Sequence, residues 1–143
     1  DGSFLSSTDC GGWATIITKN GEIEKILYRG FKNTTNNRCE IYGVLATLQY
    51  FKDPTDITIY SDSQYVVNTI NKSWLFKWIL EDDESKKNMD LWRQVAKLLT
   101  KHNVVCKWVK GHNNTPLNEL ADLYATHAAA CLNLPEDNGY IND

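Results

Sequence analysis

The sequence predicts an α/β domain in which helices flank a mixed β-sheet. Two runs of strand-forming residues on either side of Asn20-Gly21 predict a hairpin, and later segments alternate between helical and strand periodicity. The chain has 143 residues, of which 42% are hydrophobic, and this is enough for one domain with a sizeable core. Because no internal repeat, low-complexity tract or linker interrupts it, we expect residues 1–143 to form a single domain.

The first half of the chain predicts a hairpin, a helix and a buried strand. Residues 12–18 and 22–31 are rich in β-branched and aromatic residues, and both turn residues between them tolerate positive φ. Apolar residues then recur at helical spacing and predict one helical face: Ile41, Val44, Leu45, Leu48 and Phe51. Pro54 stops this helix, and residues 57–60 predict a short buried strand.

The second half continues the alternation. Ser63 is suited to cap a helix over the following residues, whereas residues 74–87, with two tryptophans and an acidic run, show no clear period. Helical spacing returns at 88–102, and residues 104–109 predict a strand. Thr115-Pro116 starts a last helix, expected to run to about Leu132, because proline is favoured at the first helical position. The polar tail after Pro135 is expected to be loose.

Composition narrows the possible functions. A net charge of −3 argues against a general nucleic-acid binder, although cations bound at an acidic site would mask part of this charge. No run of about 18 apolar residues predicts a membrane span, and no basic, apolar leader opens the chain. The four cysteines are far apart without a Cys-x-x-Cys pair, so we expect no zinc site and free thiols in a reducing cytoplasm. We also expect a monomer.

Four carboxylates fall where element ends or early helical turns are expected: Asp1, Glu40, Asp62 and Asp122. Any one of them alone is more often a cap, a turn residue or part of a solvated helix face. However, Glu40 adjoins the core-facing Ile41, and Asp62 follows a buried strand at its carboxyl end, the edge where α/β sheets bind ligands. Clustered carboxylates repel one another unless cations neutralise them, and Mg²⁺ prefers oxygen ligands.

Five motifs occur in an order that resembles type 1 ribonuclease H. They are Asp1-Gly-Ser, Thr34-Thr-Asn-Asn-Arg-Cys-Glu40, Ser61-Asp-Ser-Gln-Tyr-Val66, Trp108-Val-Lys-Gly-His112 and Asn118-Glu-Leu-Ala-Asp122. Together with the tail Glu136-Asp-Asn-Gly-Tyr140, the similarity covers nearly the whole chain. Each motif alone is weak evidence, but five in order are strong. The resemblance implies a ribonuclease H-like fold with a five-stranded mixed sheet of strand order 3-2-1-4-5.

The resemblance also implies an activity, hydrolysis of the RNA strand of RNA–DNA hybrids. The four carboxylates would ligate two Mg²⁺ ions, with Mn²⁺ as a possible substitute. One ion would activate a water for in-line attack on an RNA phosphate, and the other would stabilise the leaving 3′ oxygen. The products would carry 5′-phosphate and 3′-hydroxyl ends. His112, in a loop rich in turn formers, would assist proton transfer or product release, whereas His102 and His127 are interpreted as helix residues without chemistry.

Residues expected to hold the hybrid follow from the same resemblance. Asn37 and Gln64 would reach the minor groove near the cut strand, Thr35 and Asn36 would bind a DNA phosphate, and Trp74 would lie along the DNA sugars. Small polar residues at a helix start are also ordinary caps. Of the remaining tryptophans, we expect Trp92, Trp108 and Trp13 to lie in the core. For Trp78 the sequence does not decide between the core and a ligand contact.

Three features depart from the family pattern. The stretch Phe4–Thr8 lacks the Gly-Asn-Pro often found there, and the acidic run Glu81–Glu84 stands where many members carry a basic protrusion. An acidic run repels phosphates and weakens binding. Asp1 is the first residue, and we expect a few residues of the first strand to be missing before it. Two alternatives therefore stay open: a non-catalytic or accessory hybrid-binding domain of a larger protein, and a polynucleotidyl transferase or integrase of the same broad fold.

Overall fold

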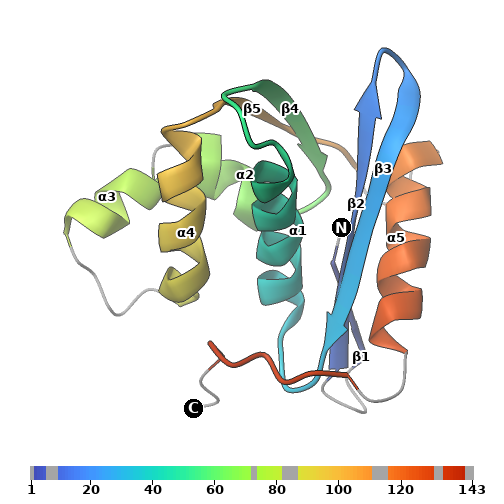
Figure 1. Ribbon diagram of the computed structural model, residues 1–143. Helices are drawn as coiled ribbons and strands as arrows, with labels where there is room; N and C mark the ends of the chain where they lie inside the picture. Colours follow the sequence, from blue (N-terminus) through green and yellow to red (C-terminus); the bar gives the residue numbers. More distant parts are fainter. Residues whose placement is uncertain are drawn as a thin grey trace.

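The architecture comes from a computed structural model, which describes residues 2–5, 10–71, 74–81, 87–110, 116–130 and 134–140 (Figure 1). The elements follow one another in this order: β1 (Gly2–Leu5), β2 (Cys10–Lys19), β3 (Glu22–Phe31), α1 (Asn36–Tyr50), β4 (Asp56–Ser61), α2 (Gln64–Asn71), α3 (Trp74–Leu80), α4 (Met89–Leu99), β5 (Asn103–Trp108) and α5 (Pro116–Ala129). The predicted elements are thus present with small shifts at their ends, and α3 occupies the segment in which the sequence shows no clear period.

The hairpin of β2 and β3 forms as its turn residues predict. Asn20 and Gly21 have φ of 55° and 80°, the left-handed values that a two-residue turn between right-twisted strands requires. β3 pairs antiparallel with β2 along its length, with a register shift between Ile17 and Thr18. β1 pairs antiparallel with the opposite edge of β2, but only over residues 10–13.

Helix α5 lies directly on this three-stranded sheet because two glycines face it. Gly12 and Gly30 are opposite each other in the β2–β3 register. A Cβ on Gly12 would collide with the Ala125 carbonyl oxygen, and one on Gly30 with the Ala128 carbonyl oxygen. Only residues without a side chain allow the helix backbone to approach the strands this closely.

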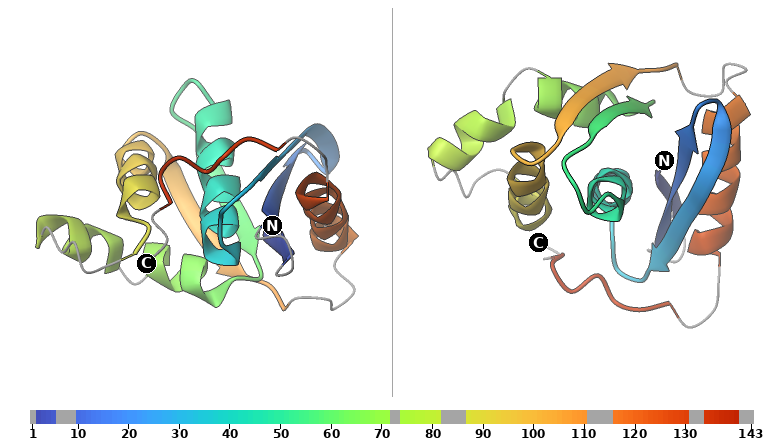
Figure 2. Two further views of the ribbon diagram at one scale, coloured as in Figure 1. Left: turned by 90° about the horizontal axis from the view of Figure 1, so that it is seen from below. Right: turned by 45° about the horizontal axis from the view of Figure 1, so that its top comes forward.

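The main hydrophobic core surrounds α1, on the other side of the sheet. Its central members come from α1, β4 and α4 and include Ile41, Leu48, Ile57, Trp92 and Val95. α4 lies beside α1, and α2 packs against the parallel pair β4–β5. In the right-hand view of Figure 2, α1 is seen nearly end-on between this pair and the three-stranded sheet. Trp92 and Trp13 are buried as predicted.

The predicted single sheet is only partly formed. The orders β1-β2-β3 and β4-β5 match two sections of the predicted order, but among the described residues no pairing joins β1 to β4. The reason is the short reach of β1, which covers β2 only as far as Trp13. The strands that the structure describes therefore form two separate sheets, one on either side of α1.

Four sequence-based expectations were wrong in detail. Trp108 is 47% exposed, because it lies at the end of β5, and is not a core residue. His102 lies in the turn after α4 instead of within a helix. α5 ends at Ala129, short of Leu132. The tail is not loose: Asp137 is buried, because Arg38 and two hydroxyl groups bind its carboxylate. Over the described part of the chain, no helix combines the length and apolarity needed to cross a bilayer.

Candidate active site

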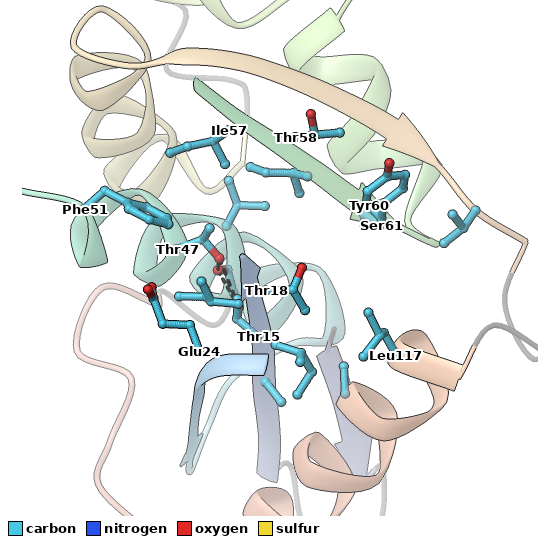
Figure 3. A pocket seen from close by; sticks show the side chains of 18 of the residues that line it. Thr15, Thr18, Glu24, Thr47, Phe51, Ile57, Thr58, Tyr60, Ser61 and Leu117 are labelled. Carbon is cyan, nitrogen blue, oxygen red and sulfur yellow. Dashed lines mark hydrogen bonds between the residues drawn. The ribbon is translucent and has the colours of Figure 1, made fainter. Parts of the chain in front are cut away.

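A cavity of about 850 Å³ lies between the two sheets. Its walls are the second half of β2, one face of α1, the whole of β4 and the first turns of α5. Figure 3 shows Thr15 and Thr18 of β2 facing Thr58 and Tyr60 of β4 across it, with Thr47 of α1 behind and Leu117 of α5 at one side. Hydrogen bonds from the Thr15 hydroxyl to the Gly43 carbonyl (2.8 Å) and from Thr47 to Thr15 (3.2 Å) join β2 to α1 here.

Two predicted catalytic carboxylates line this cavity. Glu40 projects from the second turn of α1 and is only 7% exposed. Asp62 directly follows β4 and is partly buried. The backbone of Asp62 is held by a hydrogen bond, in which the Trp108 indole N–H donates to the Asp62 carbonyl oxygen at 3.1 Å. β4 is followed by an acid at its carboxyl end, the ligand-binding edge typical of α/β sheets. The prediction that residues 57–60 form a buried strand was wrong in part, because Ile57 is buried but Tyr60 is 62% exposed.

The turn after β4 is fixed by two serines that flank Asp62. The Ser63 backbone N–H donates to the Ser61 hydroxyl at 3.1 Å. The Ser63 hydroxyl in turn accepts a hydrogen bond from the Val66 N–H at 3.2 Å, which confirms Ser63 as the residue that caps α2. These contacts define the backbone on both sides of the carboxylate.

The third carboxylate comes from the opposite layer. Asp122 is a partly buried residue of α5, and the preceding Ala121 lines the cavity. Asp1 and His112 lie outside the described residues. Within the part of the chain that is described, no three His, Cys, Asp or Glu side chains are grouped as a metal site. The structure therefore places Glu40 and Asp62 on one cavity and Asp122 beside its wall, without bringing the three into one cluster.

The predicted substrate-binding residues lie at the starts of three helices. Thr35 is the N-cap of α1, where its hydroxyl accepts a hydrogen bond from the Arg38 N–H at 3.2 Å. Asn36 and Asn37 are exposed in the first turn of α1, and Gln64 is the exposed first residue of α2. Trp74 is the first residue of α3, and its side chain lies outside the description.

A buried ionic cluster beneath these residues is a feature that sequence reasoning missed. Arg38, in the first turn of α1, is 1% exposed. Its Nε donates to the Asp137 carboxylate at 2.6 Å, and its Nη1 and Nη2 bind both oxygens of Asp90 at 2.9 and 2.8 Å. Asp137 also accepts hydrogen bonds from Thr34 and Tyr42. The sequence carried one signal, because Arg38 lies three residues before the predicted core residue Ile41 and therefore on the same helix face. A buried arginine requires an acidic partner.

The electrostatics of the cluster favour the charged forms of Arg38 and Asp137 and the neutral form of Tyr42. Burial alone would raise the pKa of Asp137, but hydrogen bonds from Arg38, Tyr42 and Thr34 outweigh it and hold this pKa below its ordinary value. Burial alone would lower the pKa of Arg38, and its bonds to Asp90 and Asp137 instead raise it. Burial, followed by the hydrogen bond to Asp137, raises the pKa of Tyr42. The start of α1 is thereby fixed to the C-terminal tail by charged groups.

The donor set of the site fits hard divalent cations. Glu40, Asp62 and Asp122 offer only carboxylate oxygens, the ligands that Mg²⁺ prefers. The described residues near them, such as Ala121 and Ser61, add no soft sulfur or imidazole donor that would favour zinc or copper. The side chains present are therefore chemically suited to Mg²⁺ or Mn²⁺.

Two β-sheets with helices on both sides, and carboxylates at the end of β4 and on adjoining helices, define an α/β nuclease of the ribonuclease H-like fold. The sequence profile of the RNase H family matches residues 1–130. The chain belongs to the RNase H family and is an enzyme of that family, a hydrolase.

Curated relatives support this over almost the full length. Ribonuclease H of Nitratidesulfovibrio vulgaris (strain DP4) is 45% identical over 145 residues, which cover 98% of this chain and 92% of the relative. Ribonuclease H of Francisella tularensis subsp. novicida is 42% identical over 135 residues, which cover 91% of this chain and 88% of the relative.

Solved structures share the fold. LC9-RNase H1, described as a type 1 RNase H with the type 2 active-site motif, superposes with a TM-score of 0.75 at 22% identity, covering 100% of this chain and 74% of that one. The foamy viral protease-reverse transcriptase in complex with RNA/DNA hybrid gives 0.72 at 21% identity, covering 90% of this chain and 19% of that one.

Proposed function

We propose that the protein is an endonuclease that hydrolyses the RNA strand of RNA–DNA hybrids. The observation that carries this proposal is the placement of Glu40 and Asp62 on one cavity at the carboxyl end of β4, in a chain that matches the RNase H family over residues 1–130. The RNA/DNA hybrid bound by the structurally similar foamy viral enzyme supports the choice of substrate. We further propose that the protein works in the cytoplasm as a monomer.

The residues proposed to hold two Mg²⁺ ions are Asp1, Glu40, Asp62 and Asp122, with Mn²⁺ as a possible substitute. Bound divalent ions would supply an activated water and would neutralise charge on the oxygens that enter and leave the phosphorus. Glu40 and Asp62 approach from two different walls of the cavity, α1 and β4. Asp122 belongs to a third element, α5, so the relative positions of these three elements determine the geometry of the site.

The proposed reaction is hydrolysis of a phosphodiester. A bond forms between a water oxygen and phosphorus, and the bond between phosphorus and the 3′ oxygen breaks. The water loses a proton and the 3′ oxygen gains one, which leaves 5′-phosphate and 3′-hydroxyl ends. His112 is proposed to transfer a proton or assist product release, since imidazole can change charge near neutral pH.

The start of α1 is suited to bind a phosphate of the DNA strand. Helix N-termini present unpaired N–H groups and a partial positive charge to anions. The Thr35 hydroxyl accepts from the Arg38 N–H, so its own proton stays available for a phosphate oxygen. Asn36 is exposed beside it. Asn37 and Gln64 are proposed to contact the minor groove, where the 2′-hydroxyls of the RNA strand lie, and Trp74 the DNA sugars.

A non-catalytic hybrid-binding domain is the second candidate. The observation that favours it is the acidic run Glu81–Glu84. Its negative charges repel phosphates and lower the affinity for the hybrid. Such a domain would bind hybrid without cutting it. A polynucleotidyl transferase of the same fold would instead join strands, and the chemistry of the products separates it from both.

The test uses a hybrid labelled on its RNA strand, with and without Mg²⁺. We expect metal-dependent cutting of RNA alone, with 3′-hydroxyl ends. Asp62→Asn should lower the rate at least about 100-fold, because it removes a charged ligand from a site whose cations stabilise the transition state by several kcal/mol. Asp53→Asn, a change at an exposed acid in the loop before β4, is the matched control and should retain full activity. Hybrid binding without cutting would favour the second candidate.

A further inference from the structure

A short C-terminal strap, residues 135–137, holds the loop between β3 and α1. The Lys32 N–H donates to the Pro135 carbonyl at 2.8 Å, and the Asp137 N–H donates to the Lys32 carbonyl at 3.2 Å. Lys32 also forms an isolated parallel bridge with the middle residue of the strap. In Figure 1 the red C-terminal segment passes beneath the first turn of α1. The backbone of the loop is therefore attached to the strap just before α1 begins.

The Asp137 side chain reaches further, to both sides of the first turn of α1. Its carboxylate accepts hydrogen bonds from the Thr34 hydroxyl at 2.8 Å and from Arg38 Nε at 2.6 Å. Thr34, Arg38 and Asp137 are all buried, with 2%, 1% and 4% of their surfaces exposed. Thr34 directly precedes the turn Thr35–Asn37, and Arg38 directly follows it. One buried carboxylate thus anchors both ends of the turn that is proposed to contact the hybrid.

The charges beneath this turn do not themselves attract a phosphate. Arg38 carries one positive charge, whereas Asp90 and Asp137, which both bind it, carry one negative charge each. The three groups together are therefore negative, and a negative group nearby weakens the binding of an anion. Any contribution of this cluster to phosphate binding must come from the geometry that it imposes on the turn.

We propose that Asp137 is a positioning residue for the contact between the start of α1 and a phosphate of the DNA strand. By bonding Thr34 and Arg38, it holds the Thr35 hydroxyl and the N–H groups of the first helical turn where a phosphate can bind them. A turn that is ordered before the hybrid arrives loses little conformational entropy on binding, and this raises affinity. The inference rests on the proposed function, because it assigns a role in holding the same substrate.

Asp90 separates this role from the effects of charge and of the bond to Arg38. It binds the same guanidinium, at 2.9 and 2.8 Å, and carries the same charge as Asp137. However, Asp90 belongs to α4, and among the described contacts its carboxylate reaches Arg38 and not the loop before α1. Asp90→Asn therefore removes the same charge while Thr34 stays anchored, and it is the matched control for Asp137→Asn.

The experiment uses RNA–DNA hybrids in which one DNA phosphate at a time is replaced by an uncharged methylphosphonate. Dissociation constants are measured by fluorescence anisotropy without divalent metal, and KM and kcat are measured with Mg²⁺. For the wild type, we expect one replacement to weaken binding about tenfold, the order expected for a hydrogen bond to a charged group. In Asp137→Asn, the unmodified hybrid should bind about tenfold more weakly, and the same replacement should have little further effect.

The steady-state constants provide a second readout that a loss of stability alone would not produce. Asp137→Asn should raise KM about tenfold with kcat nearly unchanged, because a contact made equally in the ground and transition states is lost. Asp90→Asn should bind the hybrid at least as tightly as the wild type, because it removes a negative charge and leaves the turn in place. Circular dichroism at the assay temperature verifies that each variant is folded.

A second pair of variants tests the link without changing any charge. Thr34→Val keeps the shape of the side chain but removes its hydrogen bond to Asp137. It should weaken binding in the same direction as Asp137→Asn and reduce the effect of the same methylphosphonate. Thr34→Ser keeps the hydroxyl and should bind like the wild type. This pair decides the question if Asp137→Asn is not folded at the assay temperature.

Three results would overturn the positioning role. They are unchanged or tighter binding by Asp137→Asn and Thr34→Val, equal weakening by Asp90→Asn, and a methylphosphonate effect that persists undiminished in the variants. A wild-type protein that neither binds the hybrid nor cuts its RNA would instead overturn the proposed function, and this inference with it. Failure of the inference alone is therefore distinguishable, because the wild type would still bind and cut.

Discussion

Helix α1 borders two different regions, a buried ionic cluster at its start and a cavity along its side. At its N-terminal turn, Arg38 is buried and bonded to Asp90 and Asp137, which lie 52 and 99 residues away in the sequence. Along its side, the helix borders the cavity, where one edge of β2 beyond Trp13 and one edge of β4 have no strand beside them among the described residues. In the first region the charged side chains bind one another, whereas the second region is a cavity between two sheets.

The difference shows which groups must be matched within the chain for it to fold. A buried charge without a partner costs several kcal/mol, so the Arg38 corner is stable only with the tail docked. An uncovered strand edge costs less, because water can reach it and bond its backbone groups. The corner is therefore expected to dominate folding stability, whereas the cavity separates elements that carry the predicted catalytic carboxylates Glu40 and Asp62.

The largest expected effect comes from breaking the corner with Arg38→Ala. This change leaves Asp137 buried without its cation, and losing one partner of a buried pair costs about 3–5 kcal/mol. Urea denaturation followed by circular dichroism would measure it. Lys25→Ala, which changes an exposed residue of β3, is the control and should shift the unfolding free energy by less than about 0.5 kcal/mol. A loss below 1 kcal/mol for Arg38→Ala would show that the corner does not dominate stability.

A smaller effect with a distinct pH signature is expected for Asp137→Asn. The shape is kept, but charge-assisted hydrogen bonds are lost, which costs about 2 kcal/mol at neutral pH. Because the pKa of Asp137 is lowered in the fold, its contribution is complete above its unfolded pKa of about 3.9 and disappears as the pH falls through the folded pKa. The stabilities of the two proteins should therefore converge in acid.

The neighbouring carboxylate provides the control for that titration. Glu136 accepts a hydrogen bond from the Asn33 side chain at 2.7 Å, but the pair is exposed. Glu136→Gln should therefore change stability by less than about 1 kcal/mol at neutral pH. A constant difference between wild type and Asp137→Asn from pH 7 to pH 2 would contradict the assigned role of the Asp137 charge.

The elements with a local signal were predictable from the sequence. Asn20-Gly21 fixed the hairpin turn, Ser63 the start of α2 and Pro116 the start of α5, because each acts through its own backbone or its nearest neighbours. The family-like motifs also predicted Glu40 and Asp62 as residues of one site. Both line the cavity, and their catalytic role stays a prediction.

Features that depend on distant partners were not predictable in the same way. The tail after Pro135 is polar, and only its contact with Arg38 explains why Asp137 is buried. Trp108 is as apolar as Trp92, but its place at the end of β5 leaves it half exposed. Sheet order required knowledge of which edges meet, and the β1–β4 contact is missing among the described pairings.

A third prediction concerns the other end of α1, where His102 joins three segments. Its Nδ1 accepts from the Thr55 N–H at 3.1 Å, so Nε2 carries the proton that binds the Leu48 carbonyl at 3.1 Å. His102→Ala should cost about 1–3 kcal/mol, since the buried Leu48 carbonyl and the partly buried Thr55 N–H lose their partner. Lys101→Ala, at the exposed neighbouring position, should be nearly neutral in the same thermal unfolding assay. Equal losses in the two variants would contradict the role of these hydrogen bonds.

The smallest effect is expected inside the cavity, from Thr15→Val. The change keeps the shape but removes the hydrogen bond to the Gly43 carbonyl, which joins β2 to α1. We expect a loss of about 1 kcal/mol, measured as unfolding free energy in urea. Thr18→Val is the matched control, because Thr18 is exposed in β2 and also lines the cavity.

Comparing the unfolding free energies of these two threonine variants tests what holds the cavity wall in place. If the cavity wall is held only by hydrogen bonds to α1, Thr15→Val should destabilise and Thr18→Val should not. If both variants are neutral, β2 is positioned by its pairing with β3 and its packing on α5, and the cavity wall contributes nothing measurable to folding.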